Sequence, residues 1–212
     1  MGQYGCMDDQ LKGIHQQTQA VYQDRARAFD QQRGRSGMEQ GWLDRFAAGL
    51  PQAGTVCDLG CGSGEPVSAY LISKGFELYG IDYAAAMIDM AQSRFPNHSW
   101  QVRDMRDPLL VDRYDGIVSW DGFFHLAPDE QRAALPNFAA AVRRGGNLLL
   151  TVGPHAGEVT GFVDGAEVYH SSLAPEEYRA ILTAVGFSEI EFQAEDPDCG
   201  GHSVLLAKNK GG

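Results

Sequence analysis

The sequence predicts an α/β protein with an open, mostly parallel β-sheet and helices on both of its faces. One observation is the alternation of short strand-like runs with helical segments, which is the element order of parallel sheets. Another is the loop after the first strand-like run (55–59), which has glycine at alternate positions from Gly60 to Gly64, so that its backbone can turn tightly and approach a ligand closely. A third is Asp82, which follows the second strand-like run at the distance where dinucleotide-binding folds place an acid.

Two helices are expected before the first strand. Residues 8–33 have a helical pattern with an apolar or aromatic stripe, and the glycine-rich stretch 34–37 breaks it. Residues 38–50 place several large apolar side chains on one face of a second helix, which Pro51 and Gly54 end. These side chains are those of Trp42, Leu43, Phe46 and Leu50.

The alternation continues through the rest of the chain. Proline suits the first turn of a helix, so the segment after the glycine loop should become helical near Glu65 and Pro66. The run 147–152 is apolar throughout, which is typical of a strand covered on both faces. The expected elements are strand 76–81, helix 84–94, strands 99–102 and 114–120, a helix from 128, strand 147–152, helix 175–185, and strands 187–194 and 203–207.

The helix that begins at Pro128 contains two breaking signals. Pro136 should kink or split it, because proline removes a backbone donor from the helix interior. The glycine pair at 145–146 should end it, with Arg143 and Arg144 near the negative pole of the helix dipole. We therefore expect a helix that extends to this glycine pair.

A short hairpin is expected near 157–170. Residues 158–162 and 166–170 flank the dipeptide Asp164–Gly165, which favours a tight two-residue turn between antiparallel strands. Such an insertion after a sheet strand would form a rim or lid beside the ligand site.

Composition excludes several classes of protein. The net charge of −11 argues against a protein that grips a nucleic-acid backbone, which needs a basic face. No apolar run reaches the roughly 20 residues of a membrane span. The N-terminal sequence lacks both the basic and the apolar region of a secretory signal. We therefore expect a cytoplasmic protein with no membrane or nucleic-acid partner.

The cysteines give no sign of a metal or redox site. The chain has four, and no two are spaced as C-x-x-C, so neither a zinc ribbon nor a thioredoxin motif is predicted. The spacing of Cys199 and His202 matches no standard metal pattern. The four are Cys6, Cys57, Cys61 and Cys199.

Three acids at three successive strand ends carry a resemblance to a known family. The stretch Asp58-Leu-Gly-Cys-Gly-Ser-Gly64, followed by Asp82 and then Asp104, resembles the motifs of the class I S-adenosylmethionine-dependent methyltransferases, in particular their small bacterial members. The resemblance covers roughly residues 43–207. It implies a Rossmann-like fold with a seven-stranded, mostly parallel sheet whose last strand is antiparallel.

The resemblance also implies a cofactor site. Asp82 would take the ribose hydroxyls of S-adenosylmethionine, Asp104 the adenine amino group, and the glycine loop the amino-acid end. The stretch 22–30 resembles a helix that closes over the cofactor in small members of the family. The implied cofactor-binding residues are Tyr22, Arg27, Asp58, Gly60, Cys61, Gly62, Gly64, Asp82, Tyr83, Met87, Asp104, Met105 and Trp120.

Candidates for activating a methyl acceptor lie beyond the fourth strand. His125 follows that strand closely and can act as a base near neutral pH. Asp121 precedes it, and Tyr169 and His170 end the expected hairpin. The sulfonium methyl is already activated, so an acceptor that arrives deprotonated needs no base, and the residues leave this alternative open.

The resemblance implies a single domain over 1–212, with residues 1–37 as a helical lid and 38–208 as the Rossmann-like core. The expected function is methyl transfer to a small molecule by a monomer or homodimer; the methylated element is not indicated. A nicotinamide-dependent dehydrogenase would carry G-x-G-x-x-G, which the loop lacks. A module that binds the adenosyl cofactor without catalysis is the other alternative, because fold does not fix function.

Overall fold

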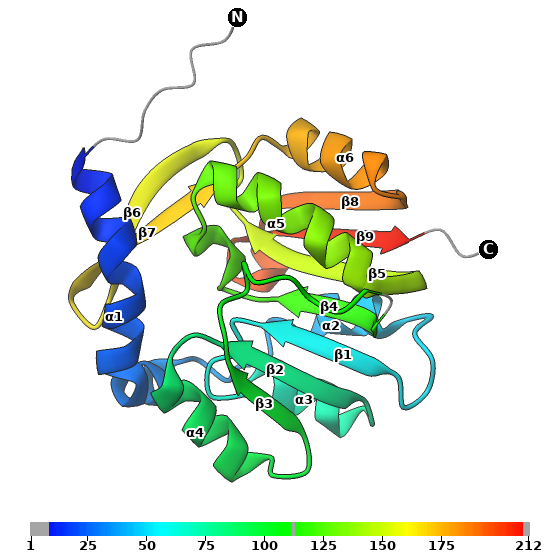
Figure 1. Cartoon of the computed structure of the whole chain (residues 1–212), viewed down its shortest axis with the longest axis horizontal. Coiled ribbons are helices and arrows are strands. Elements are labelled where there is room, and N and C mark those ends of the chain that lie inside the picture. The colour runs from blue at the N-terminus through cyan, green and yellow to red at the C-terminus, as the bar shows by residue number, and fades with distance from the viewer. Residues whose placement is uncertain (1–8, 112, 210–212) are drawn as a thin grey trace, which may run out of the picture.

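A computed structural model describes residues 9–111 and 113–209 of the chain. In this part of the chain one seven-stranded sheet has the order β3-β2-β1-β4-β5-β9-β8 (Figure 1). Its strands are β1 (Thr55–Leu59), β2 (Glu77–Asp82), β3 (Ser99–Val102), β4 (Tyr114–Ser119), β5 (Val142–Val152), β8 (Phe187–Asp196) and β9 (His202–Asn209). The first five pair in parallel, and β9 runs antiparallel to both of its neighbours. The predicted sheet with an antiparallel last strand is confirmed.

Helices cover both faces of the sheet, as predicted. In Figure 1, α5 (Pro128–Ala141) and α6 (Pro175–Ala184) lie in front of it, and α2 (Gln40–Ala47) and α3 (Val67–Ser73) lie behind. Helix α4 (Ala85–Arg94) packs against β2 and β3. No helix of the described residues is both long and apolar enough to cross a membrane.

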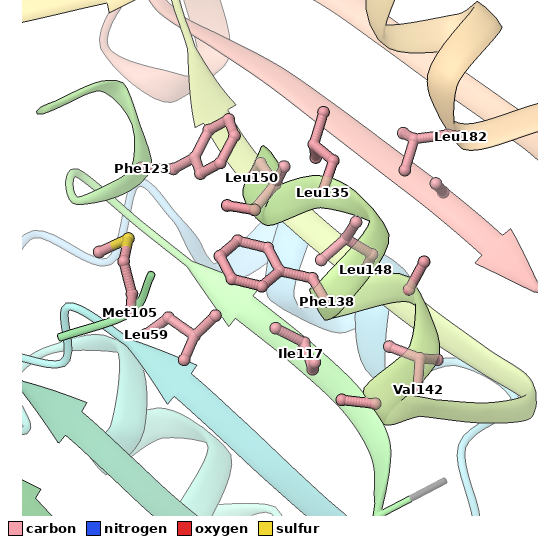
Figure 2. Close-up of a cluster of buried hydrophobic side chains, with 14 of the residues drawn as sticks. Leu59, Met105, Ile117, Phe123, Leu135, Phe138, Val142, Leu148, Leu150 and Leu182 are labelled. Carbon is pink, nitrogen blue, oxygen red and sulfur yellow. The ribbon is translucent and has the colours of Figure 1, made fainter. Parts of the chain in front are cut away.

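The two faces of the central strands bury separate apolar clusters, because successive side chains of a strand point to opposite faces. Ile117, Leu148 and Leu150 face α5 and α6 and pack with Phe138 of α5 and Phe123 (Figure 2). The neighbouring positions face α2 and α3 instead; they are Val118, Leu149, Val204 and Leu206. This burial on both faces explains the continuous apolar run in β5.

The end of α5 differs from the prediction. The helix ends at Ala141, and Arg143 and Arg144 belong to β5, so the expected helical extension to the glycine pair is wrong. The pairing of β4 with β5 shifts register between Tyr114 and Gly116, and the glycine pair lies in this irregularity. A Cβ at position 146 would come within 2.4 Å of the Asp115 carbonyl oxygen, so glycine permits a close backbone approach there.

Two further features of the helices concern Pro136 and Pro66. Helix α5 is continuous through Pro136, so the split considered for it does not occur. Pro66 is the N-cap of α3, whose first residue is Val67, so the expected helix start is displaced by about one residue. Differences of this size at helix ends are ordinary.

The predicted hairpin is present as β6 (Gly157–Val163) and β7 (Ala166–Ser172). Asp164 and Gly165 both have positive φ, of 46° and 77°, which a tight hairpin turn of this type requires. Helix α1 (Asp9–Gln32) lies against this hairpin in Figure 1 and crosses the carboxyl ends of the parallel strands. The predicted start of this helix at residue 8 lies outside the described residues.

Candidate functional site

A cavity that is partly open to solvent lies where β1, β2 and β4 end, beneath α1. Open parallel sheets bind their ligands at this edge. Twelve of the predicted site residues line it, and the structure thus brings most of the expected constellation together. They are Tyr22, Asp58, Gly60, Cys61, Gly62, Asp82, Tyr83, Met87, Met105, Trp120, Asp121 and His125.

The glycine loop and Asp82 form the floor of this cavity. Gly60 and Gly62 have φ of 74° and 53°, a backbone conformation that other residues adopt reluctantly. The two carboxylate oxygens of Asp82 accept the backbone N–H groups of Gly62, at 2.9 Å, and Ala84, at 2.8 Å. Burial raises the pKa of Asp82 to about 6, and the two backbone hydrogen bonds oppose that rise. Asp82 therefore fixes the loop and also presents its carboxylate to the cavity.

Asp58 is a second buried acid in the same wall. Its side chain is 2% exposed and accepts a hydrogen bond from the Ser68 hydroxyl at 2.6 Å. Burial raises its pKa to about 7, and the neighbouring Asp82 adds to the rise. Two buried acids in one cavity lower the cost of binding a positively charged ligand there.

Tyr22 and His125 meet at the cavity from opposite sides. The Tyr22 hydroxyl of α1 lies 2.9 Å from Nε2 of His125, which stands in the 3₁₀ turn η1 (Phe123–His125) after β4. Nδ1 of His125 lies 2.7 Å from the backbone carbonyl oxygen of Tyr169 in β7. Burial lowers the pKa of His125 to about 4, so the ring is neutral at physiological pH.

Asp121 joins a chain of charged groups beside the cavity. Its carboxylate lies 3.0 Å from the Arg33 guanidinium and 3.0 Å from Nε2 of His202, and Arg33 also contacts Glu39 at 3.1 Å. Nδ1 of His202 faces the Cys199 carbonyl oxygen at 2.8 Å. The hydrogen bond to Asp121 raises the pKa of His202. Asp121 has a positive φ of 55°, which is uncommon for a residue other than glycine.

A family model described as a methyltransferase domain matches residues 56–146, which include the glycine loop, Asp82 and His125. Residues 56–146 are a methyltransferase domain. The predicted resemblance to the methyltransferases is thereby confirmed over these residues, and the strand order of the sheet confirms the predicted fold.

Two proteins that are similar in sequence to this chain are methyltransferases by name. YqeM of Bacillus subtilis (strain 168), whose methyltransferase name is provisional, is 33% identical over 102 residues, or 46% of this chain and 40% of that protein. The tRNA (carboxymethyluridine(34)-5-O)-methyltransferase alkbh8 of Xenopus tropicalis is 26% identical over 153 residues, or 72% of this chain and 23% of its own. The chain therefore spans less than half the length of either relative.

A solved structure shares the fold of the described residues. The 1,6-didemethyltoxoflavin-N1-methyltransferase of Burkholderia thailandensis superposes with a TM-score of 0.70 at 18% identity, over 99% of this chain and 93% of that one. That protein was crystallised with its substrate and S-adenosylhomocysteine. At this identity the likeness establishes the fold of the methyltransferase domain.

Some predicted residues lie outside the main cavity. Asp104 borders a neighbouring cavity that shares Tyr83, Met105 and His125 with the first, and its carboxylate pairs with Arg106. Arg27 and Gly64 line neither of these two cavities.

Of the two hairpin candidates, Tyr169 presents its backbone to the site. Its hydroxyl donates to Glu158 at 2.5 Å, and its carbonyl accepts from His125. The His170 ring lies 5.0 Å from that of His125, centroid to centroid. The roles of these residues stay predictions.

Sequence reasoning missed a set of polar contacts, centred on one carboxylate of α1, that binds this helix to the methyltransferase domain. Asp30, near the end of α1, binds both terminal nitrogens of Arg94 on α4, at 2.7 and 2.6 Å. It also accepts from the Ser63 hydroxyl of the glycine loop at 2.5 Å. The hydrogen bond from Arg94 is the main cause that lowers the pKa of Asp30 to about 2. The signal in the sequence was a single acid at the end of the predicted apolar or aromatic stripe, which has no specificity alone.

We expect Asp30→Asn to loosen α1. Hydrogen bonds to charged groups contribute about 1.5–3 kcal/mol, so amide exchange in residues 9–32 should rise roughly 10- to 100-fold. Hydrogen exchange read by mass spectrometry measures this, with exposed Asp24→Asn on the same helix as the control. Unchanged exchange in α1, or an equal rise in β4 and β5, would show that Asp30 does not act as a local fastening.

Asp58 should make the stability of the fold depend on pH. Its folded pKa of about 7 lies above the roughly 3.9 of an unfolded chain, so ionised Asp58 destabilises the fold, and this cost grows as pH rises from about 4 to 7. Asparagine does not titrate and can still accept from Ser68. We therefore expect Asp58→Asn to gain stability relative to wild type between pH 5 and pH 8, measured by urea denaturation. A difference that does not vary with pH would contradict this assignment.

Proposed function

We propose that this protein is an enzyme that transfers the methyl group of S-adenosylmethionine to a small-molecule acceptor. The observation that carries the proposal is the cavity under α1, where the glycine loop and the Asp82 carboxylate meet. The methyltransferase domain supports the same conclusion, as does the B. thailandensis protein of the same fold, which holds S-adenosylhomocysteine.

One unsatisfied donor and one cation of the cavity fit the amino-acid end of this cofactor. Nε1 of Trp120 is buried and has no hydrogen-bond partner among the described residues. An orphaned buried donor is costly, so it calls for an acceptor from a ligand. Arg33 lines the same cavity and, with Trp120, would receive a carboxylate. The acids Asp58 and Asp82 would face the positive ammonium and sulfonium groups.

The remaining parts of the cofactor match the predicted residues. Each Asp82 oxygen accepts one backbone N–H and keeps a second lone pair for a ribose hydroxyl. Tyr83 and Met105 line both neighbouring cavities and would flank the adenine ring, with Asp104 near its amino group. When bound, the cofactor supplies a methyl carbon that is already activated by its sulfonium. The protein's part is to orient the two reactants, which can lower a barrier by roughly 7–11 kcal/mol at best.

A small acceptor suits the way this cavity is closed. Helix α1 covers the cavity and is fastened at Asp30, and Arg25 on the same helix binds the hairpin turn at Asp164. We infer that residues 1–37 act as a lid on a single domain whose core is 38–208. A net charge of −11 disfavours an RNA acceptor, although the Xenopus relative is a tRNA methyltransferase.

Labelled-methyl transfer tests this function. The full chain is incubated with methyl-labelled S-adenosylmethionine and, separately, a small-molecule extract, total RNA and a protein extract. We expect label in the small-molecule pool and none with Asp82→Ala. Label in RNA or protein alone would overturn the acceptor class. Tight cofactor binding without transfer to any pool would instead indicate a non-catalytic binding module.

A further inference from the structure

Three groups from three elements form one chain of hydrogen bonds at the cavity. Nδ1 of His125 faces the Tyr169 carbonyl oxygen, which can only accept, so Nδ1 carries the proton. Nε2 then holds a lone pair, and the Tyr22 hydroxyl must be the donor in the 2.9 Å contact with it. The direction of the first hydrogen bond follows from the carbonyl, and that of the second follows from the carbonyl and a neutral ring.

The lone pair on Nε2 persists at physiological pH. The His125 side chain is 9% exposed, and burial keeps its ring neutral. The titratable groups that face the ring are His170 from β7, Asp121 after β4, and His15 and Tyr22 from α1. Of these, Asp121 favours a proton on His125, and the two histidines oppose it.

Tyr22 is held in place from several sides. Its ring meets the edges of Phe29, at 5.3 Å between centroids, and Tyr83, at 6.5 Å. Its helix is tied to the hairpin turn near Arg25 and to the glycine loop at Asp30. A ligand that displaced the Tyr22 side chain would have to break its hydrogen bond with His125 and its ring contacts with Phe29 and Tyr83. A hydroxyl that donates to Nε2 can still accept a hydrogen bond, so Tyr22 can stay where it is and receive a proton from the cavity.

We propose that Tyr22 and His125 form a proton relay that deprotonates the methyl acceptor, and that the acceptor is a small molecule methylated on a neutral hydroxyl. This inference rests on the proposed methyl transfer. It makes Tyr22 the catalytic residue that contacts the acceptor, and the Tyr169 carbonyl the positioning group that fixes the tautomer of His125. A carboxylate acceptor is already ionised at physiological pH, so it has no proton for such a relay to remove.

The relay balances in atoms and charge. The acceptor hydroxyl gives its proton to the Tyr22 oxygen while the Tyr22 proton passes to Nε2 of His125. The acceptor oxygen forms the new bond to the methyl carbon, and the C–S electron pair leaves with the sulfur. The positive charge thus moves from the sulfonium to the His125 imidazolium, whose Nδ1–H stays on the Tyr169 carbonyl. Solvent then removes the proton from Nε2.

The tautomer of His125 is tested without any acceptor. Nitrogen-15 NMR of the imidazole in the full chain should show a protonated Nδ1 and a bare Nε2 down to about pH 5, given a pKa of about 4. Tyr22→Phe keeps the ring contacts and should shift the Nε2 signal toward that of a nitrogen without a donor. A protonated Nε2, or a signal that Tyr22→Phe does not move, would overturn the relay whatever the activity.

Kinetics supply the second readout, with the small-molecule extract as the probe. Tyr22→Phe and His125→Gln should each slow labelled-methyl transfer by roughly 10²- to 10⁴-fold. The double variant should be no slower than the slower single variant, because the two residues act as a unit. For an acceptor hydroxyl with a phenol-like pKa of about 10, both defects should shrink at pH 9–10, where the acceptor ionises without help. Exposed His155→Gln and Tyr70→Phe, whose hydroxyl faces Asp44 on the surface, are the controls.

These measurements distinguish a failure of the proton relay from a failure of the proposed methyl transfer. Tyr22→Phe within threefold of wild type, with His125→Gln slow, would overturn the relay and leave His125 as a direct base. Failure of the wild-type protein to bind S-adenosylhomocysteine would overturn the proposed function and the relay with it. Binding together with a protonated Nε2 would overturn the relay alone.

Discussion

Replacing Asp82 by alanine is expected to lower the affinity for S-adenosylhomocysteine by roughly 10²- to 10⁴-fold. The carboxylate holds the Gly62 and Ala84 N–H groups and is the acceptor proposed for the ribose hydroxyls. Hydrogen bonds to a charged group contribute about 1.5–3 kcal/mol each, and the loss of two corresponds to this change. Calorimetric titration of the purified variant measures it.

Two further variants sharpen the test of Asp82. Asp82→Asn keeps one oxygen that can accept, so its loss of affinity should be smaller than that of alanine. Asp89→Ala removes an exposed acid from α4 and should leave the affinity unchanged. Affinity for the alanine variant within threefold of wild type, in a folded sample, would show that Asp82 does not hold the ligand.

The substitution Phe138→Ala should have the largest effect on stability. Phe138 is fully buried between α5 and the sheet, and its ring lies 5.8 Å from that of Phe123, centroid to centroid (Figure 2). Such truncations cost about 3–5 kcal/mol, because they leave a cavity in a packed core. For a domain of this size we expect the melting temperature to fall by roughly 6–20 °C. Circular dichroism during heating measures the change.

Phe162 provides the matched control for Phe138. Its side chain is 71% exposed on β6, so Phe162→Ala should alter stability by less than about 0.5 kcal/mol. Phe138 also supports the turn that carries His125, because Phe123 begins that turn. A melting temperature for Phe138→Ala close to that of Phe162→Ala would contradict the packing of the apolar cluster between the sheet and helices α5 and α6.

The sheet was predictable because its signals are local. A continuous apolar run marks a strand that is covered on both faces, as in β5, and Asp164–Gly165 marks a tight turn whatever surrounds it. The glycine loop and Asp82 are separated by one βα unit, so their meeting also follows from short-range order. The predicted site residues at strand ends accordingly gather at one cavity.

The features that sequence reasoning missed depend on tertiary contacts. The end of α5 was misplaced because Arg143 and the glycine pair have the composition of a helix end, whereas pairing with β4 extends the strand to Val142. The Asp30 carboxylate accepts hydrogen bonds from Ser63 and Arg94, which lie far from it in the chain, and no spacing rule links these residues. The carbonyl that orients His125 belongs to the backbone of Tyr169, and a backbone group leaves no trace in residue identity.

Titration of the full chain with S-adenosylhomocysteine tests the central claim most directly. The account predicts binding at micromolar concentration or tighter, at one site per chain. A folded protein that binds no S-adenosylhomocysteine would contradict this account. The cavity would then serve another ligand, and the proposed methyl transfer would be wrong.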